Sequence, residues 1–432
     1  MKNETRYLFI VIYCATVINL LTINARTEAY YNELFKTNVY WNYNVKSLAF
    51  SPDSGRLVVA YGSTSGYLWE WDVTNRTLWN KHEVCDPWFE CVVYSPDGRY
   101  VAASFTSSFQ GDVYSLVRVY DTTKNYDLCE HVIQSSGISS LDFSKDGRII
   151  AFCYSQDYCK QIRFLYFRGP YFDGYNYTYS LTWTNTYKLE YAPNSVKYSP
   201  NGQYLAYSTE IGTVGVLDAS NVTNLLKVNE FTNHLDVAFS VVFSPDGTLI
   251  ASCGYDGKIV VRKFPSGDIQ WVVSNDCPVY DLRFSPDGKI LLAYDIDSTD
   301  YLNTLQSLKF WRVSDGRLLL KHNCDVPISA IDIAPNGSYF AYALNGRTSD
   351  IIVATLPVWI EDIKLEDNNT NVVLSLCGGN GVYQVQACSN LISNDWQNAG
   401  LPTTNKTIKV PAAKTTYYRV ISLPLTNNTA NP

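Results

Sequence analysis

Short runs of alternating apolar and polar residues recur along this chain, separated by tight turns. An alternating run such as Val279–Phe284 precedes one kind of turn, and a more continuous apolar run such as Thr248–Ser252 follows it. A third run, for example Lys258–Arg262, comes next, and a second turn such as Pro265–Asp268 leads to a fourth run. Alternation with a period of two is typical of β-strands that bury one face. The pattern therefore predicts an all-β protein built from units of four strands.

The turn between the first and second runs has the sequence Ser-Pro-Asp-Gly or a close variant of it, and this motif occurs seven times. Its Pro fixes φ at the second turn position, and its Gly allows a positive φ. Successive copies lie 41 to 55 residues apart, which is the length of one four-stranded propeller blade. The seven copies are Ser51–Gly55, Ser95–Gly98, Ser144–Gly147, Ser199–Gly202, Ser244–Gly247, Ser285–Gly288 and Ala334–Gly337.

These repeats resemble the WD40 family from about Asn44 to Pro357. Trp71-Asp72 is a literal Trp-Asp ending of a third strand, and the fifth repeat matches the family best. The resemblance implies a seven-bladed β-propeller in which His234, Ser252 and Asp256 form a structural hydrogen-bond network. Arg262 replaces the family's Trp, so we expect that network to be incomplete. A TolB-like periplasmic propeller, which shares the Ser-Pro-Asp-Gly turn, is the alternative.

The two ends of the repeat array predict the domain organisation. The seventh repeat stops after three strands near Leu356, whereas Leu34–Trp41 is a strand-like segment ahead of the first repeat. In WD40 proteins such an N-terminal strand completes the last blade, and closure leaves no long sheet edge. We therefore predict a propeller over residues 30–357. Residues 358–432 lack the repeat and predict a small β-sandwich, which resembles fibronectin-like modules of secreted bacterial proteins.

The first residues have the layout of an export signal. Lys2 and Arg6 form a basic start, and the mostly apolar stretch Tyr7–Leu21 follows with 15 residues. A membrane helix needs about 20 apolar residues. We therefore predict a signal peptide over residues 1–25 and a secreted or periplasmic protein without a membrane span. A signal anchor that holds the chain at the cell surface is the alternative.

Cysteines and glycosylation sequons bear on the same compartment. Of 11 Cys, one lies in the predicted signal and an even number remains, as expected in an oxidising environment. Local spacing predicts the disulfides Cys153–Cys159 and Cys377–Cys388, and leaves the pairing of these six open: Cys85, Cys91, Cys129, Cys253, Cys277 and Cys324. Sequons, which are meaningful in a eukaryotic but not a bacterial host, start at Asn75, Asn176, Asn221, Asn336, Asn368, Asn405 and Asn427.

The chemistry-bearing residues favour binding over catalysis. The net charge of −7 and the lack of a basic run exclude the electrostatic footprint of a nucleic-acid-binding protein. Four His occur without a triad pattern, and no P-loop or Cys-x-x-Cys pair is present. The acidic stretch Asp295–Asp300 lacks the Gly and Glu of an EF-hand loop. We therefore predict no metal, no cofactor and no enzymatic activity; a hydrolase or lyase on a propeller is the alternative.

The loop lengths predict which face of the ring binds a partner. In a WD40-type ring, the loops before the first strand and between the second and third strands share one face, called the top. The long insertions Thr106–Ser115 and Asp295–Gln306 fall between second and third strands, and variable loops on a repeated scaffold usually carry function. We therefore predict an exported interaction scaffold that binds a protein or a glycan, or else a cell-surface adhesion component. The predicted contact residues are Phe109, Tyr114, Asp297 and Tyr301.

Overall fold

The computed structural model describes the greater part of the chain. The described residues are 10–11, 33–39, 44–62, 66–84, 88–109, 112–123, 127–133, 137–154, 160–172, 177–296, 306–346, 349–366, 371–378, 382–388, 397–399, 401–411 and 417–423. They contain 35 strands and no helix. It follows that no helical segment suited to a membrane crossing occurs among them. The chain divides into two compact units, of which the larger spans Phe35–Asn336 and Phe340–Val353.

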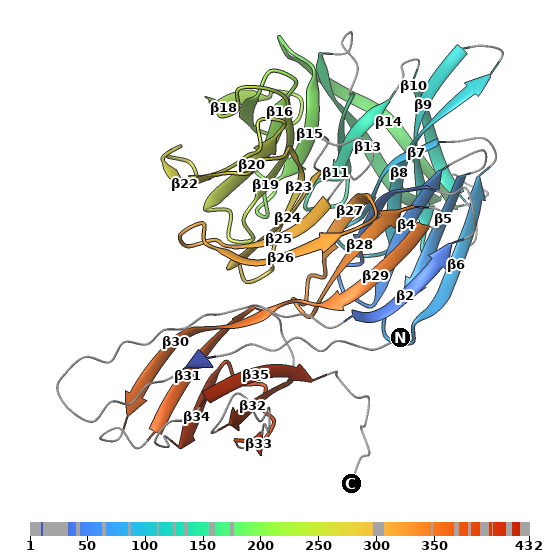
Figure 1. The fold of residues 1–432 in the computed structure, drawn as a ribbon. Coiled ribbons are helices and arrows are strands. Elements are labelled where there is room, and N and C mark those ends of the chain that lie inside the picture. The colour runs from blue at the N-terminus through green and yellow to red at the C-terminus, as the bar shows by residue number, and fades with distance from the viewer. Residues whose placement is uncertain are drawn as a thin grey trace. The chain divides into compact units, whose positions relative to one another are not determined.

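Seven four-stranded antiparallel sheets form a β-propeller, which confirms the predicted fold class (Figure 1). Blades 1 to 4 contain the strands β3 (Asn44–Phe50), β4 (Arg56–Gly62), β5 (Gly66–Asp72) and β6 (Thr77–Val84); β7 (Trp88–Tyr94), β8 (Tyr100–Phe109), β9 (Asp112–Asp121) and β10 (Asp127–Ile133); β11 (Ile138–Phe143), β12 (Ile149–Tyr154), β13 (Gln161–Phe172) and β14 (Tyr177–Lys188); β15 (Pro193–Tyr198), β16 (Tyr204–Thr209), β17 (Thr213–Asp218) and β18 (Leu226–Thr232).

Blades 5 to 7 follow the same order, with the first strand innermost. They contain β19 (Ala238–Phe243), β20 (Leu249–Gly254), β21 (Lys258–Lys263) and β22 (Ile269–Ser274); β23 (Val279–Phe284), β24 (Ile290–Ile296), β25 (Gln306–Arg312) and β26 (Leu318–Cys324); β27 (Ile328–Ile333), β28 (Tyr339–Asn345), β29 (Ser349–Thr355) and β2 (Glu33–Val39).

The ring is closed by the N-terminal strand. β2 pairs with β29 as the outer strand of blade 7, as the truncated seventh repeat predicts. Polar side chains of blade 7 also hold the first strand of blade 1: Asn345 Oδ1 accepts the Val45 amide at 2.9 Å, and Asp332 Oδ2 accepts the Phe50 amide at 2.8 Å. Strand pairing and these side-chain bonds together join the two ends of the repeat array.

The recurring turn motif is stabilised by its own side chains. In blade 5, Ser244 Oγ donates to Asp246 Oδ1 at 2.6 Å and accepts the Leu249 amide at 2.9 Å. Gly247 takes a φ of +72°, a conformation that costs residues with a Cβ about 1–2 kcal/mol. The turn sequence therefore fixes where each first strand ends and the second begins, and it places all seven turns at one end of the blades.

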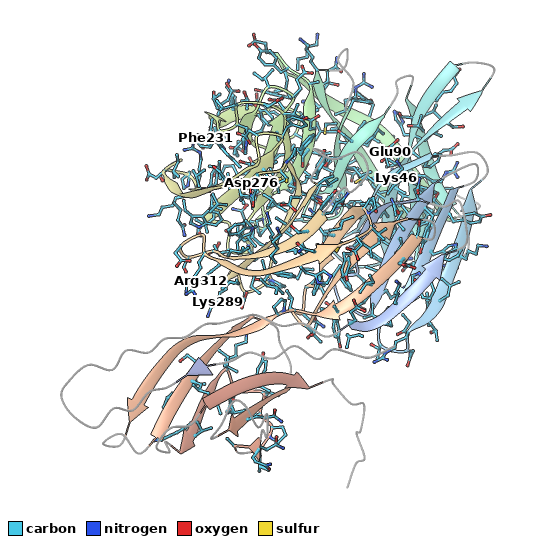
Figure 2. The ribbon with its side chains drawn as sticks, viewed as in Figure 1. Lys46, Glu90, Phe231, Asp276, Lys289 and Arg312 are labelled. Carbon is cyan, nitrogen blue, oxygen red and sulfur yellow. The ribbon has the colours of Figure 1, made fainter. Side chains whose placement is uncertain are left out.

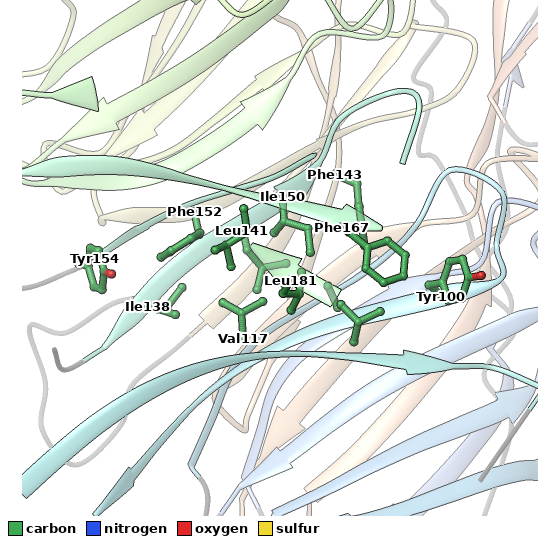
Figure 3. Close-up of a cluster of buried hydrophobic side chains, with 13 residues drawn as sticks. Tyr100, Val117, Ile138, Leu141, Phe143, Ile150, Phe152, Tyr154, Phe167 and Leu181 are labelled. Atoms are coloured by element: carbon green, nitrogen blue, oxygen red, sulfur yellow. The ribbon is translucent and has the colours of Figure 1, made fainter. Parts of the chain in front are cut away.

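The hydrophobic core lies between adjacent blades. Figure 3 shows the cluster that joins blade 2 to blade 3, in which Tyr100 and Val117 of blade 2 meet Leu141, Phe152 and Phe167 of blade 3. Within a strand, every second residue enters this cluster, and the residues between them enter the clusters on the other side of the blade, so blades 2 and 3 bury both of their faces. Burial of this kind contributes about 1.5–3 kcal/mol per large side chain and makes the ring a rigid scaffold.

The smaller unit contains two antiparallel sheets, which agrees with a small sandwich only in outline. One sheet has β30 (Val358–Glu366), β31 (Asn371–Gly378) and β34 (Thr407–Pro411); the other has β1 (Ile10–Val11), β35 (Tyr417–Leu423), β32 (Val382–Cys388) and β33 (Gln397–Asn398). Residues 10–11, inside the predicted signal, thus pair with β35. Because β31 and β32 belong to different sheets, the predicted pair Cys377–Cys388 does not flank a hairpin; its side chains lie outside the described residues.

The predicted Cys153–Cys159 disulfide does not agree with the structure. Cys153 is a free, buried thiol, and its sulfur lies 3.3 Å from Ser139 Oγ. The register of β12 and β13 sets Cys153 opposite Ile162, so the side chain points into the core of the propeller. Cys159 itself lies outside the described residues. Close spacing in the sequence suggested a hairpin cross-link, but the pairing register places the thiol elsewhere.

The insertion Thr106–Ser115 is wrongly predicted as a loop. β8 and β9 continue through it as a ladder, in which Thr106 pairs with Ser115 and Phe109 pairs with Asp112. The backbone of the insertion is therefore a hairpin arm that extends blade 2. The second insertion is a connection between β24 and β25 whose residues 297–305 lie outside the described part of the chain.

Candidate functional site

A cavity of about 180 Å³ opens where the first strands of all seven blades meet. Every first strand contains a β-bulge at the same point, one or two residues after the strand begins. A bulge leaves one residue out of the ladder and re-aims its side chain. All seven bulged residues line the cavity, and they are Lys46, Glu90, Ser139, Asn194, Phe239, Tyr280 and Ser329.

One side of the cavity is aromatic. The rings of Phe239 and Tyr280 stack with centroids 4.6 Å apart and an interplanar angle of 13°. Tyr294 continues this column at 6.1 Å from Tyr280, and Tyr255 meets Phe239 edge-on at 6.3 Å. Phe239 and Tyr280 are only half-buried, so blades 5 and 6 offer an apolar surface beside the opening. Such surfaces are a usual contribution of aromatic residues to binding sites.

The opposite side of the cavity is charged. Lys46 and Glu90 project from neighbouring blades 1 and 2 and lie close together in Figure 2. Burial raises the pKa of the Glu90 carboxyl above its usual range, and the charge of Lys46 opposes that shift. The cavity therefore has an aromatic wall and a polar wall, an asymmetry that suits a ligand with both kinds of group.

A belt of ion pairs crosses the blades below the opening. Lys197 of blade 4 lies 3.6 Å from Asp142 of blade 3. Arg283 of blade 6 bridges Asp281 at 2.7 Å and Asp332 of blade 7 at 3.3 Å. Each of these carboxylates faces a cation, and two of the pairs join first strands of neighbouring blades.

The predicted structural network of blade 5 is formed by the side chains that the sequence suggests. His234 Nδ1 lies 2.9 Å from Asp256 Oδ1, and His234 Nε2 lies 2.9 Å from Ser252 Oγ. Arg262 does not leave the network incomplete: its Nε donates to Asn233 Oδ1 at 2.7 Å, and Asn233 Nδ2 donates to Ser252 Oγ at 3.2 Å. The guanidinium thus takes part where the family's Trp would stand, through one additional side chain.

This network predicts a pH-dependent contribution to stability. Burial lowers the pKa of His234 despite the opposing effect of Asp256. The unfolded chain therefore binds a proton at His234 more readily than the folded chain, and stability is lost as the pH falls below the unfolded value of about 6.5. We expect His234→Gln to cost about 1–3 kcal/mol near neutral pH, with a difference that narrows on acidification. Urea unfolding of both proteins between about pH 5 and 8 measures this; a difference that widens at low pH would contradict it.

Of the four residues predicted to contact a partner, the structure describes the side chain of Tyr114 alone. Tyr114 lies on β9, half-buried against the core between blades 1 and 2, and it does not line the cavity. The Phe109 side chain, Asp297 and Tyr301 lie outside the described residues. Asp295, the first residue of the acidic stretch, is buried and binds Ser307 and Lys309. Within the described residues, no cluster of three His, Cys, Asp or Glu is arranged to hold a metal.

The described sequons lie on exposed connections. Asn75 is held in the turn after β5 by two hydrogen bonds to Asp72, at 2.7 and 3.0 Å. Asn221, Asn336 and Asn405 are exposed as well. None of these four lines the cavity. Asn176, Asn368 and Asn427 lie outside the described residues.

Comparison with known proteins gives a family match that begins in the last strand of blade 4 and covers most of blade 5. The family model described as WD domain, G-beta repeat matches residues 226–262, which run from β18 to β21 and include the His234 network. The chain is 24% identical to Protein groucho of Drosophila melanogaster over 173 residues, which are 38% of this chain and 21% of that protein. It is 26% identical to transducin-like enhancer protein 2 of Mus musculus over 169 residues, 38% of this chain and 20% of the relative. The matched region thus covers about a fifth of each relative.

Proposed function

We propose that this protein is a non-catalytic interaction scaffold that binds a protein partner over the cavity at the top of the propeller. The observation that carries the proposal is the placement of seven bulged residues around one opening. Each bulge leaves its residue out of the ladder and re-aims the side chain, and bulges are frequent beside functional sites. The half-buried rings of Phe239 and Tyr280 supply the aromatic anchor surface typical of binding hot spots.

The proposal includes export of the protein and a glycan as the second candidate partner. Export is supported by the basic start and apolar stretch of residues 1–25. A glycan is favoured by the stacked pair Phe239 and Tyr280, because a sugar ring presents an apolar face with polar groups at its rim. Asn194 and several serines also line the cavity and supply polar groups.

Replacing both Phe239 and Tyr280 with Ala is expected to weaken partner binding at least about tenfold, since two anchor side chains are removed. The full-length chain serves as bait for extracts of its source, and captured proteins are quantified by mass spectrometry against the wild type. The matched control is Lys145→Ala with Lys263→Ala, because both lysines are exposed at the opposite end of the blades. Equal capture by the aromatic variant and the wild type, or loss only in the lysine variant, would refute the proposed face.

A further inference from the structure

An exposed apolar rim adjoins the aromatic side of the cavity. Leu235 is 86% exposed, Tyr255 is 49% exposed and Ile211 is 40% exposed. All three lie in short connections at the cavity end of blades 4 and 5. Neighbouring exposed apolar side chains on a soluble domain mark an interaction surface more often than isolated ones.

Hydrogen bonds fix the three connections against one another. The Gly212 carbonyl accepts the His234 amide at 3.2 Å, which joins the connection of Ile211 to that of Leu235. The Leu235 amide donates to Asp256 Oδ2 at 3.1 Å, which joins it to the connection of Tyr255. Because these connections are tight and mutually bonded, a partner would meet a preformed surface and would lose little free energy in ordering it.

The same connections carry an excess of negative charge. Four carboxylates and one cation, Lys258, lie in the connections 209–212, 233–237, 255–258 and 275–278. His234 adds no positive charge near pH 7, because burial lowers its pKa. Asp256 is occupied by His234 at 2.9 Å and by Lys258 at 3.8 Å, whereas Asp236 and Asp276 are exposed. Asp276, labelled in Figure 2, belongs to the connection between β22 and β23. The apolar rim is thus bordered by acidic groups.

We infer that the partner presents an extended protein segment in which an aliphatic or aromatic side chain is flanked by Lys or Arg. The apolar side chain packs on Leu235 and Tyr255, and the basic residues lie beside Asp236 and Asp276. Complementary charge sets orientation and speeds association, while burial of the apolar anchor supplies affinity. This inference rests on the proposed function, because it names the chemistry of the partner that binds the top of the ring.

The test uses the full-length chain and three labelled nonapeptides in fluorescence anisotropy. The first has a Leu-Phe-Leu centre with Lys and Arg flanks, the second has the same centre with Glu flanks, and the third has a Ser-Gly-Ser centre with the basic flanks. We expect the first peptide to bind at least about tenfold more tightly than the others. Its binding is expected to weaken as salt is raised, because exposed charges are screened.

Variants locate the surface. Leu235→Ser is expected to weaken the first peptide about tenfold, and Asp276→Lys about fivefold at low salt, with a smaller effect at high salt. Leu401→Ser is the matched control, because Leu401 is 89% exposed and lies in the smaller unit; it is expected to bind like the wild type. Leu235 and Asp276 are both exposed, so neither Leu235→Ser nor Asp276→Lys removes a core contact. A loss of binding by these variants would therefore not be caused by unfolding.

Several outcomes overturn the inference. They are a first peptide that fails to bind, equal binding of the Glu-flanked peptide, or equal affinity of Leu235→Ser and the wild type. If Phe239→Ala with Tyr280→Ala abolishes capture of the native partner while Leu235→Ser and Asp276→Lys do not, this inference fails and the proposed function stands. If none of these variants alters capture, both fail.

Discussion

Replacing Gly212 with Ala is expected to destabilise the propeller by about 4 kcal/mol, a large fraction of the stability of a typical domain. Gly212 has a φ of +84°, and a Cβ there would lie 2.4 Å from the His234 carbonyl oxygen and 2.6 Å from that of Asp236. Both obstructing atoms are backbone, so no side-chain rotation relieves the contact. Relief requires the connection before β19 to move, and that movement disrupts the His234 network.

Gly247→Ala is the matched control for Gly212→Ala. Gly247 has a similar φ of +72°, but the nearest atom to its added Cβ is Pro200 Cδ at 3.9 Å, an ordinary contact. We expect a cost of about 1–2 kcal/mol, which is the backbone strain alone. Urea or guanidinium unfolding of both variants measures the two costs. Equal destabilisation by the two substitutions would show that the backbone obstruction at Gly212 contributes nothing.

The number of blades and the closure of the ring follow from the sequence, because both depend on local signals. Each turn motif fixes one strand boundary through residues only a few positions apart, as Ser244 and Asp246 illustrate. The closing strand could be predicted because the seventh repeat lacks a fourth strand and a strand-like segment, residues 34–41, precedes the array. The missing fourth strand of the seventh repeat and the unassigned segment 34–41 together predict the closure.

The cavity residues could not be predicted in the same way. A bulge interrupts the alternation of apolar and polar residues that predicts a strand. The sequence pattern therefore does not distinguish Phe239 and Tyr280 from the other residues of their strands. Their common position becomes visible only when the registers of all first strands are compared. Attention to long insertions led instead to Phe109 and Tyr114. The site could be found by comparing the second and third residues of the first strand in all seven repeats, because the bulged residue is one of these two.

The hairpin arm of blade 2 has a local signal in the sequence. Phe109 pairs with Asp112, so only two residues, Gln110 and Gly111, connect the strands. A two-residue connection with Gly in the second position favours a tight hairpin. Reading Thr106–Ser115 for its turn instead of its length would have predicted strands. The register that buries Cys153 opposite Ile162, by contrast, had no comparable signal in the sequence.

The ion pair between Asp295 and Lys309 gives the second large expected effect. The two side chains lie on adjacent strands of blade 6, and the residues are only 5% and 9% exposed. Lys309 also donates to Asn275 Oδ1 at 2.8 Å, and Asp295 accepts the Ser307 amide at 3.1 Å. Lys309→Met leaves a buried carboxylate without its cation, and we expect a loss of about 3–5 kcal/mol.

A double-mutant cycle separates the pair from its surroundings. Asp295→Asn keeps a side-chain oxygen for the Ser307 amide but removes the charge. We therefore expect Asp295→Asn with Lys309→Met to be about 2 kcal/mol more stable than Lys309→Met alone, because no uncompensated charge remains buried. Denaturant unfolding of the wild type, both single variants and the double variant gives the coupling free energy. Additive costs of the two substitutions would mean that Asp295 and Lys309 do not depend on each other, and that the carboxylate is stabilised by Ser307 alone.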